Sequence, residues 1–417
     1  MRKMKDSRIE WIGKIPETWG ISKLKYIGKY INGYAFKPSD WSDTGRKIIR
    51  IQDLTGSYDN PNYYDGDIDS KYVIKNGDIL VSWAATLDAF IWHKDEGLLN
   101  QHIFKAIPDK KIIDYNFFFW MIKIAMENMN NDNKHGIFMQ HVTLDVFNNF
   151  TIPLPKISEQ SRIATFLTSR CDEINAVLEK TRASIKEYKK LKQAVITQAV
   201  TKGIRGDRPM KDSGSIWFGN IPVDWDMKKI KYLFHIKKDI AGQEGYTVLS
   251  ITQKGIVPKD LSKNEGQLAE NYSHYQLVNP GDYAMNHMDL LTGWVDISKY
   301  TGVTSPDYRV FVLDDLESNN RSFYLYLMQM CYSNRIFYGL GQGVSGMGRW
   351  RLQADKFLNF SIVVPSKDEQ QEIADYLDAK CAEIDNLISK KEQYITEIEN
   401  YKKSLIYEYV TGKKEVI

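Results

Sequence analysis

The stretch SEQSRIATFLTSRCDEINAVLEKTRASIKEYKKLKQAVITQAVTK, from Ser158 to Lys202, decides the fold of this chain. Ser158 is a suitable helix N-cap, and no Pro or Gly follows it up to Lys202, a run far longer than the ~11–12 residues of an average helix. The residues that step by 4 and 3 along it are Leu167, Cys171, Ile174, Leu178, Thr181, Ile185, Tyr188, Lys192, Val195 and Ala199. This heptad pattern predicts a long helix that lies along another helix.

The same pattern returns 210 residues later, from Asp368 to Gly412. Its seam positions are Leu377, Cys381, Ile384, Ile388, Lys391, Ile395, Ile398, Lys402, Leu405 and Tyr409. The first stretch carries nine basic and five acidic residues between 159 and 202, whereas the second carries five and ten between 369 and 412. Opposite net charges favour an antiparallel pair within one chain, although merely solvated helix faces are the alternative.

A second repeat precedes each helix at an offset of 206 residues. Met4–Tyr26 reads MKDSRIEWIGKIPETWGISKLKY and Met210–Tyr232 reads MKDSGSIWFGNIPVDWDMKKIKY. We call these segments the anchors. Their paired Trp residues around a Pro-containing turn predict a folded loop, which either packs only within its domain or also presents a face to a partner.

Between each anchor and the following helix lies a block that agrees in layout more than in residues. Each block offers short β-like runs, one aromatic helix-like stretch, a Gly-Asp turn and a closing apolar strand that ends in Pro. The runs are 47–52, 79–83 and 103–107 with the helix 115–129, then 246–252, 282–285 and 309–313 with the helix 322–338. The turns are Gly77-Asp78 and Gly281-Asp282, and the closing strands are 150–155 and 360–365.

We therefore expect an α+β fold: two mixed α/β globular domains joined by two long helices that form an antiparallel intramolecular coiled coil, with a pseudo-twofold internal repeat. The expected boundaries are 1–157 (anchor 4–26), 158–203 for the first helix, 204–367 (anchor 210–232), and 368–417 for the second helix and tail. The chain has 417 residues, a net charge of +3 and three Cys, which is ordinary for a protein of a reducing cytoplasm. Without an apolar signal region or a long apolar run, secretion and membrane insertion are not expected.

Motifs for catalysis or metal binding are missing or incomplete. No His/Cys pair has metal-ligand spacing, so no metal is expected. Gly341–Gly346 satisfies G-x-G-x-x-G, but a helix-like segment precedes it where a dinucleotide site requires a strand. The sequence therefore predicts no catalytic residue and no cofactor of its own.

Two loops are the best candidates for DNA recognition. In the second block, Gln342, Arg349, Trp350 and Arg351 combine flexible backbone with guanidinium groups that suit guanine or phosphate. The matching first-block loop holds Lys134, Gln140 and His141, and Gln suits adenine. An ordinary polar loop is the alternative for both. Secondary candidates, which equally suit core or turn positions, are Trp83, Asn100, Gln101 and His102 in the first block and Asn286, His287, Tyr308 and Arg309 in the second.

The chain resembles the specificity subunits of type I restriction–modification systems. The resemblance rests on the duplicated W-I-G-x-I-P-x-x-W anchor (Trp11–Trp19 and Trp217–Trp225, with Phe218 for Ile) and the duplicated P-x-x-x-E-Q-x-x-I-A-x-[FY]-L helix start (Pro155–Leu167 and Pro365–Leu377). Ser305-Pro306-Asp307-Tyr308 adds to it, whereas the first block has Asn100-Gln101-His102 near that place.

The resemblance implies a non-catalytic subunit whose two blocks are target recognition domains, each reading one half of an asymmetric split site in double-stranded DNA. The helices would set the spacer between the halves. Two adenine-N6 methyltransferase subunits with S-adenosylmethionine, and endonuclease–translocase subunits with ATP and Mg, would be the partners. The residues expected to hold partners are Trp11, Ile15, Pro16, Trp19, Trp217, Ile221, Pro222, Trp225, Gln160 and Gln370.

Two other functions stay open at this point. A scaffold would use both blocks to bind proteins and would not retain DNA sequence-specifically. An enzyme with its own site would transfer methyl groups without partners. The bases read, the spacer length and the role of the polar seam positions Thr181/Lys391 and Lys192/Lys402 do not follow from the sequence.

Overall fold

The computed structural model describes residues 2–56, 61–132, 142–260, 271–343 and 350–416. The chain divides into two compact units. The first unit comprises residues 1–181 and 393–417, and the second comprises residues 182–392. Each unit therefore contains one anchor, one block and part of both long helices.

The anchors form the same small structure in both units. In the first, β1 (Met4–Asp6) pairs antiparallel with β2 (Lys14–Pro16), and β3 (Gly20–Lys23) pairs with the closing strand β12 (Thr151–Leu154). In the second, β13 (Met210–Asp212) pairs with β14 (Asn220–Pro222), and β15 (Asp226–Lys229) pairs with β26 (Ser361–Val364). The closing strands thus bring each long helix back to its anchor.

The block of the first unit is built on a four-stranded antiparallel sheet in the order β4-β11-β8-β9. Its strands are β4 (Gly28–Asn32), β11 (Ile103–Pro108), β8 (Ile79–Ser82) and β9 (Asp88–Ile91). Ile79 and Val81 pack in the core that includes helix α2 (Tyr115–Asp132), whereas Leu80 packs on the opposite face, as strand alternation requires.

A second sheet, β6-β5-β10-β7, covers that opposite face of the first block. Its strands are β6 (Tyr63–Tyr64), β5 (Arg46–Ile49), β10 (Gly97–Leu99) and β7 (Val73–Ile74). The remaining short elements are η1 (Leu24–Tyr26), η2 (Pro38–Asp40), α1 (Ile51–Thr55), η3 (Ser70–Tyr72) and α3 (Leu144–Asn149).

The block of the second unit repeats this plan with the sheet β16-β23-β20-β21. The strands are β16 (Phe234–Lys237), β23 (Arg309–Leu313), β20 (Tyr283–Met285) and β21 (Val295–Ile297), and α5 (Arg321–Ser333) packs on one face. The smaller pairs are β17 (Leu249–Thr252) with β18 (Gly255–Pro258), β19 (Gln276–Val278) with β22 (Gly302–Thr304), and β24 (Gln342–Gly343) with β25 (Trp350–Arg351). The helical elements are η5 (Ile230–Tyr232), α6 (Ile336–Leu340) and α7 (Ala354–Asn359).

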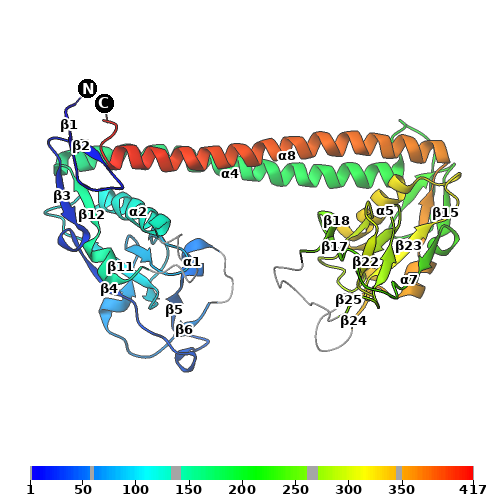
Figure 1. The fold of residues 1–417 in the computed structure, drawn as a ribbon, viewed down its shortest axis with the longest axis horizontal. Coiled ribbons are helices and arrows are strands. Elements are labelled where there is room, and N and C mark those ends of the chain that lie inside the picture. Colours follow the sequence, from blue (N-terminus) through cyan, green and yellow to red (C-terminus); the bar gives the residue numbers. More distant parts are fainter. Residues whose placement is uncertain (1, 57–60, 133–141, 261–270, 344–349, 417) are drawn as a thin grey trace. The chain divides into compact units, whose positions relative to one another are not determined.

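The long helices are α4 (Ile157–Lys202) and α8 (Lys367–Val410), within one or two residues of the expected bounds. Figure 1 shows them side by side and antiparallel in each unit. In the first unit Leu167, Cys171 and Leu178 are buried, with Ile174, Ile395 and Ile398 half-buried; in the second, Ile185, Leu377, Ile384 and Ile388 are buried. The α+β fold with two paired long helices and an internal repeat is thereby confirmed.

Three local expectations were wrong. Ser158 is not the N-cap of the first long helix, because α4 already begins at Ile157. The aromatic stretch 322–338 is two helices, α5 and α6, because Arg335 between them has φ +57°, in the left-handed region. The run 47–52 is not one strand, because β5 ends at Ile49 and α1 begins at Ile51. The Gly-Asp turns do have the expected geometry: Gly77 has φ +90° and Gly281 φ +92°, which favours glycine.

Candidate nucleic-acid interface and the helix–anchor junctions

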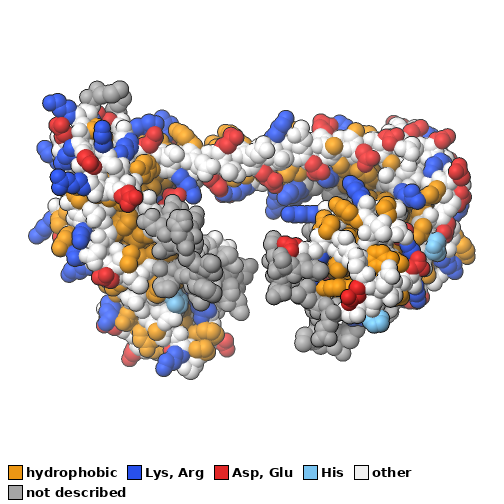
Figure 2. All heavy atoms as spheres, in the orientation of Figure 1, with side chains coloured by type: hydrophobic (Ala, Val, Ile, Leu, Met, Phe, Trp, Pro, Cys, Tyr) orange, Lys and Arg blue, Asp and Glu red, His pale blue; other side chains and the backbone are white. Residues whose placement is uncertain are grey.

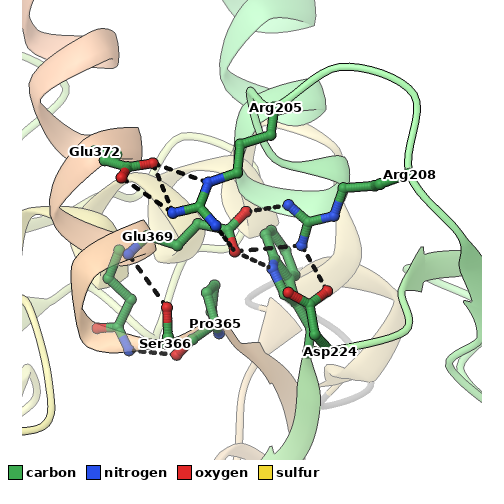
Figure 3. A network of polar contacts seen from close by, with 9 residues as sticks. Arg205, Arg208, Asp224, Pro365, Ser366, Glu369 and Glu372 are labelled. Atoms are coloured by element: carbon green, nitrogen blue, oxygen red, sulfur yellow. Dashed lines mark hydrogen bonds and ion pairs between the residues drawn. The ribbon is translucent and has the colours of Figure 1, made fainter.

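The start of α8 is held to the second anchor by a buried carboxylate, that of Glu369 (Figure 3). Trp225 Nε1 donates to Glu369 Oε2 at 2.9 Å, and Arg208 donates to both Glu369 oxygens. The hydrogen bonds from Arg208 to Glu369 are the main reason that the pKa of Arg208 is raised above its ordinary value. The acid also lies in the first helical turn, where the helix dipole favours negative charge.

A second arginine follows α4 in this junction. Arg205 donates from Nε and Nη2 to Glu372 at 3.0 Å, and Arg208 also reaches Asp224 at 2.8 Å (Figure 3). The loop that leaves α4 is therefore tied both to the first turns of α8 and to the anchor. We call this group the second junction.

The first unit repeats the part of this group formed by tryptophan, arginine and helix-start glutamate, which we call the first junction. Trp19 Nε1 donates to Glu159 Oε2 at 2.9 Å, and Arg2 pairs with Glu159. The guanidinium of Arg2 lies 5.1 Å from the Trp19 ring centre, and that of Arg208 lies 5.6 Å from the Trp225 ring centre. Each anchor therefore uses one tryptophan, one arginine and one helix-start glutamate.

The glutamines that follow these two glutamates also form hydrogen bonds within their own unit. Gln160 donates to the Pro155 oxygen at 2.9 Å and accepts from the Asp114 backbone N–H at 2.8 Å. Gln370 donates to the Pro365 oxygen at 2.9 Å and accepts from the Asn320 N–H at 2.8 Å. Both side chains are buried, so they connect the helix start to the block beside it.

Most residues expected to hold partners therefore pack or form hydrogen bonds within their own unit. Those that are buried are Ile15, Pro16, Trp19, Ile221, Pro222, Trp225, Gln160 and Gln370. Trp11 and Trp217 are half-buried, and Trp11 Nε1 donates to the Thr151 oxygen at 3.2 Å. Contact between these residues and a partner stays a prediction.

Four junction residues were missed from the sequence: Glu159 and Glu369, and their partners Arg2 and Arg208. Arg2 and Arg208 differ by the same offset of 206 as the anchors, and each precedes the anchor Met by two residues. Extending the repeat comparison by two residues at its start would have found the arginines.

The second unit brings together several residues proposed for DNA recognition. His287, in the loop after β20, gives its backbone oxygen to the Leu352 N–H at 3.0 Å, which places Arg351 beside it. Arg309 donates to the Leu352 oxygen at 2.8 Å and lies 4.9 Å from the Phe357 ring centre. We call His287, Arg309 and Arg351 the basic cluster.

Burial and mutual repulsion determine the ionisation of this cluster. Burial, followed by the charges of Arg309 and Arg351, lowers the pKa of His287 to about 4. Burial lowers the pKa of Arg309 to about 10, still well above neutrality. His287 Nδ1 and Arg351 Nε are both buried and have no hydrogen-bond partner among the residues that the structure describes. At neutral pH the cluster therefore holds two guanidinium charges around a neutral imidazole.

The remaining second-block candidates lie around the cluster in different ways. Trp350 stacks on Tyr338 with ring centres 5.4 Å apart, and Gln342 is exposed opposite Arg351 in the β24–β25 pair. The Asn286 backbone oxygen accepts from the Tyr332 hydroxyl at 2.6 Å. Tyr308 packs with the apolar cluster on the other face of the sheet from Arg309. Arg349 lies outside the described residues.

Arg309 itself is only 5% exposed, which favours the core alternative for this residue. Its guanidinium fixes the backbone at Leu352 and so supports the segment that carries Arg351. Arg351, which is only partly buried, is the better candidate for direct contact with DNA.

The first unit has aromatic and amide groups at the matching place. Val81 pairs with Phe104 across the sheet just as Met285 pairs with Arg309, so Phe104 occupies the position of Arg309. Trp83 follows Val81 by two residues, as His287 follows Met285. The Trp83 backbone oxygen accepts from the Val142 N–H at 2.9 Å, and the His287 backbone oxygen accepts from the Leu352 N–H. Trp83 stacks on Phe104 with ring centres 5.8 Å apart.

A pocket of about 1130 Å³ opens beside this stack. Its polar lining is Asn32, Arg50, Gln52, Thr55, Thr86, Asn100, Gln101, His102 and Thr143. Gln101 Nε2 lies 3.2 Å from His102 Nε2, and Trp83 Nε1 is buried with no hydrogen-bond partner in the described part of the chain. Lys134, Gln140 and His141 lie outside the described residues.

The polar seam positions also have partners within each unit. In the second, Lys192 Nζ lies 2.6 and 2.8 Å from the Asp385 oxygens, and the Lys391 ammonium lies 5.6 Å from the Tyr188 ring centre. In the first, Lys402 Nζ donates to Asn175 Oδ1 at 2.7 Å. These contacts pair α4 with α8 at matched heights.

Among the residues that the structure describes, no helix combines the length and the hydrophobicity that a membrane span requires. No group of three or more His, Cys, Asp or Glu side chains is placed there to hold a metal ion.

Known proteins are similar to this chain in sequence and in fold. A family model described as "Type I restriction modification DNA specificity domain" matches residues 16–187 and again residues 222–400. The chain is 27% identical to the "Type I restriction enzyme MjaVIII specificity subunit" of Methanocaldococcus jannaschii, over 97% of this chain and 94% of that protein. It is 22% identical to the "Type I restriction enzyme EcoBI specificity subunit" of Escherichia coli, over 70% of this chain and 59% of that protein.

A solved structure titled "Structural basis underlying complex assembly and conformational transition of the type I R-M system" has the same fold. Its TM-score is 0.64 at 16% identity, over 96% of this chain and 99% of that one. The two family matches together cover most of the chain and coincide with its internal repeat. The chain therefore belongs to the family of type I restriction–modification DNA specificity subunits, which recognise DNA and leave catalysis to other subunits of the complex.

Proposed function

We propose that each unit reads one half of a split, asymmetric DNA site. The observation that carries this proposal is that both junctions use one tryptophan, one arginine and one helix-start glutamate, while the matched recognition positions differ: Trp83 and Phe104 in one unit, His287 and Arg309 in the other. One frame with two different surfaces suits two different base sequences.

The chemistry of the two surfaces supports different base preferences. Arg351 and the neighbouring candidates Arg349, Trp350 and Gln342 suit guanine O6 and N7, or phosphate. Gln101 and Gln140, with His141 and Lys134, suit adenine or a mixed site. Asn286 and Tyr308 would act at the edge of the second surface, through backbone or packing rather than charge.

The helices would set the spacer between the two half-sites. At ~1.5 Å per residue, 46 residues of α4 extend ~69 Å and 44 residues of α8 extend ~66 Å. One turn of B-DNA is ~34–36 Å, so helices of this length are compatible with half-sites about a turn apart.

Catalysis would be supplied by partners that dock on the anchors and helices. These are two adenine-N6 methyltransferase subunits, which carry S-adenosylmethionine, and endonuclease–translocase subunits, which use ATP and Mg. The complex would act on chromosomal or invading DNA in the cytoplasm. No residue of this chain is assigned a catalytic role.

Exchange of the first block tests the proposal. Residues 27–157 are replaced by the block of another specificity subunit, and modified adenines are mapped in cells that carry the partner genes. One half of the modified site should change while the other half and the spacer remain. Unaltered methylation, or assembly with partners but no sequence-specific DNA retention, would favour the scaffold alternative.

A further inference from the structure

Most residues that are identical in the two anchors have an internal role. Ile15, Pro16 and Trp19 and their counterparts are buried. Asp6 accepts from the Arg8 N–H at 2.9 Å and Asp212 from the Gly214 N–H at 3.0 Å, so these acids close the hairpin turns. Packing and turn formation therefore explain why the repeat retains these residues.

One segment has the same two lysines and tyrosine in both anchors, and packing does not explain its tyrosine. It is Lys23-Leu24-Lys25-Tyr26 in the first anchor and Lys229-Ile230-Lys231-Tyr232 in the second, and we call it the Lys-x-Lys-Tyr segment. Of its side chains, Lys25 has an internal partner, because its Nζ donates to Asn149 Oδ1 at 3.0 Å. Only its apolar residue is buried, Leu24 and Ile230 both being 0% exposed. The tyrosines are 62% and 69% exposed, so the fold does not require them.

The exposed lysine and tyrosine side chains also make the same contact in both units. The Lys25 ammonium lies 5.2 Å from the Tyr26 ring centre, and the Lys231 ammonium lies 5.3 Å from that of Tyr232. The blocks that follow differ, so this surface is not part of what distinguishes one half-site from the other. When a chain binds two copies of the same molecule, we expect it to expose the same surface in both of its units.

The surroundings of the segment favour a protein partner. Apolar side chains flank it, Ile21 at 45% exposure in the first unit and the half-buried Met227 in the second, where Tyr232 and Met227 line one shallow groove. Tyrosine and apolar groups inside a charged rim are typical of protein interfaces, whereas phosphate binding needs cations alone.

The charge of the surface favours an acidic partner. Without the junction arginines, residues 3–30 carry seven basic and three acidic side chains, and the matching residues 209–236 carry four and three. Figure 2 shows Lys and Arg side chains gathered over the part of the first unit where β1, β2 and β3 lie. Complementary charge would orient an acidic surface on each anchor.

We propose that the two Lys-x-Lys-Tyr segments are matched docking surfaces for two copies of one protein with an acidic face, one copy on each unit. This inference rests on the proposed function, which makes that protein the methyltransferase subunit. The tyrosines and lysines then make the contact.

The test compares three variants of the full chain with one control. Lys25→Glu/Tyr26→Ala alters the first segment, Lys231→Glu/Tyr232→Ala alters the second, and a fourfold variant alters both. Lys299→Glu/Tyr300→Ala changes the same residue types at another exposed place in the second unit. Each protein is titrated with the purified methyltransferase subunit of the same system, and the mass of the complex is measured by sedimentation.

The unaltered chain and the control should bind two methyltransferase subunits. Each double variant should bind one, with the lost copy weakened about tenfold or more, and the fourfold variant none, at unchanged urea midpoints. If all variants still bind two copies, the inference is wrong while the proposed function stands. If the unaltered chain binds none, the proposed function itself fails. If instead the variants bind two copies but the salt dependence of DNA retention becomes shallower, the segment contacts phosphates and the inference is overturned.

Discussion

The junctions and the recognition surfaces of the two units have diverged to very different degrees. At the junctions, Trp19 and Trp225 each donate to a helix-start glutamate at 2.9 Å. At the recognition surfaces, an aromatic stack of Trp83 on Phe104 occupies the place where the other unit holds His287 and Arg309. The tryptophan and glutamate of each junction depend on each other and are the same in both units. Residues at the end of a strand can change from stacked aromatic rings to charged side chains without altering the sheet.

The largest effect is expected from removing the junction carboxylate. Glu369→Ala leaves the Arg208 charge and the Trp225 N–H without their partner, and should destabilise the second unit by about 3 kcal/mol. Glu159→Ala should cost less, about 1–2 kcal/mol, because the Glu159 side chain is 18% exposed whereas that of Glu369 is 1% exposed. Urea unfolding followed by tryptophan fluorescence measures both.

The control for this prediction is Glu372→Ala, whose side chain is 49% exposed and should matter by less than about 1 kcal/mol. Equal losses for the Glu369 and Glu372 variants would contradict the role given to the buried carboxylate.

The second prediction separates the two recognition surfaces. Arg351→Ala should relax discrimination in one half-site by about 10- to 100-fold and leave the other half unchanged. Gln101→Ala is the matched variant and should relax only the opposite half. Binding of duplexes with single changes in either half, at fixed salt, measures both effects. A uniform loss over both halves would indicate a phosphate contact instead.

The third prediction concerns pH and distinguishes His287 from Trp83. Because burial and two arginines lower the pKa of His287 to about 4, the folded state takes up this proton less readily than the unfolded chain. The stability linked to His287 is therefore fully present above the unfolded pKa of ~6.5 and is lost as the pH falls toward 4.

The measurement for this prediction is the urea midpoint of the second unit at pH 7 and pH 5. His287→Gln should narrow the difference between the two values. The first unit carries Trp83 at the matching place and should not change with this substitution. An undiminished difference in the variant would assign the pH dependence to other groups.

The smallest effect is expected at the helix seam. Lys192 pairs with Asp385, whereas the matching Lys402 meets the neutral Asn175. Asp385→Asn should cost less than about 1 kcal/mol, because the Asp385 side chain is 56% exposed, and the loss should shrink at high salt. Asn175→Asp is the reciprocal change and should stabilise by a similar amount; urea midpoints at low and high salt check both.

The frame could be predicted from the sequence because its periodicities are long and occur twice. The seam of α4 and α8, the anchors and the closing strands all follow from repeated spacing. The break between α5 and α6 could not be predicted, since it depends on the left-handed backbone at Arg335 within an otherwise helical pattern. The burial of Arg309 could not be predicted either, because its acceptor is a backbone oxygen 43 residues away.

The recognition residues were harder to predict for a physical reason. The sequence pattern indicates which face of a strand is apolar. It does not indicate which loops at the strand ends lie next to one another. His287 and Arg351 lie far apart in sequence, and the backbone hydrogen bond between His287 and Leu352 brings them together. Tyr308 and Arg309 are adjacent in sequence and yet point to opposite faces of the sheet.

The division of the chain between its two units has a consequence for synthesis on the ribosome. The second unit is a continuous segment, residues 182–392, whereas the first needs residues 393–417 in addition to residues 1–181. Lys413 Nζ, for example, donates to the Ile12 oxygen at 2.7 Å. The half that is translated first must therefore wait for the last residues before its core can close, and the half that is translated second can fold before it.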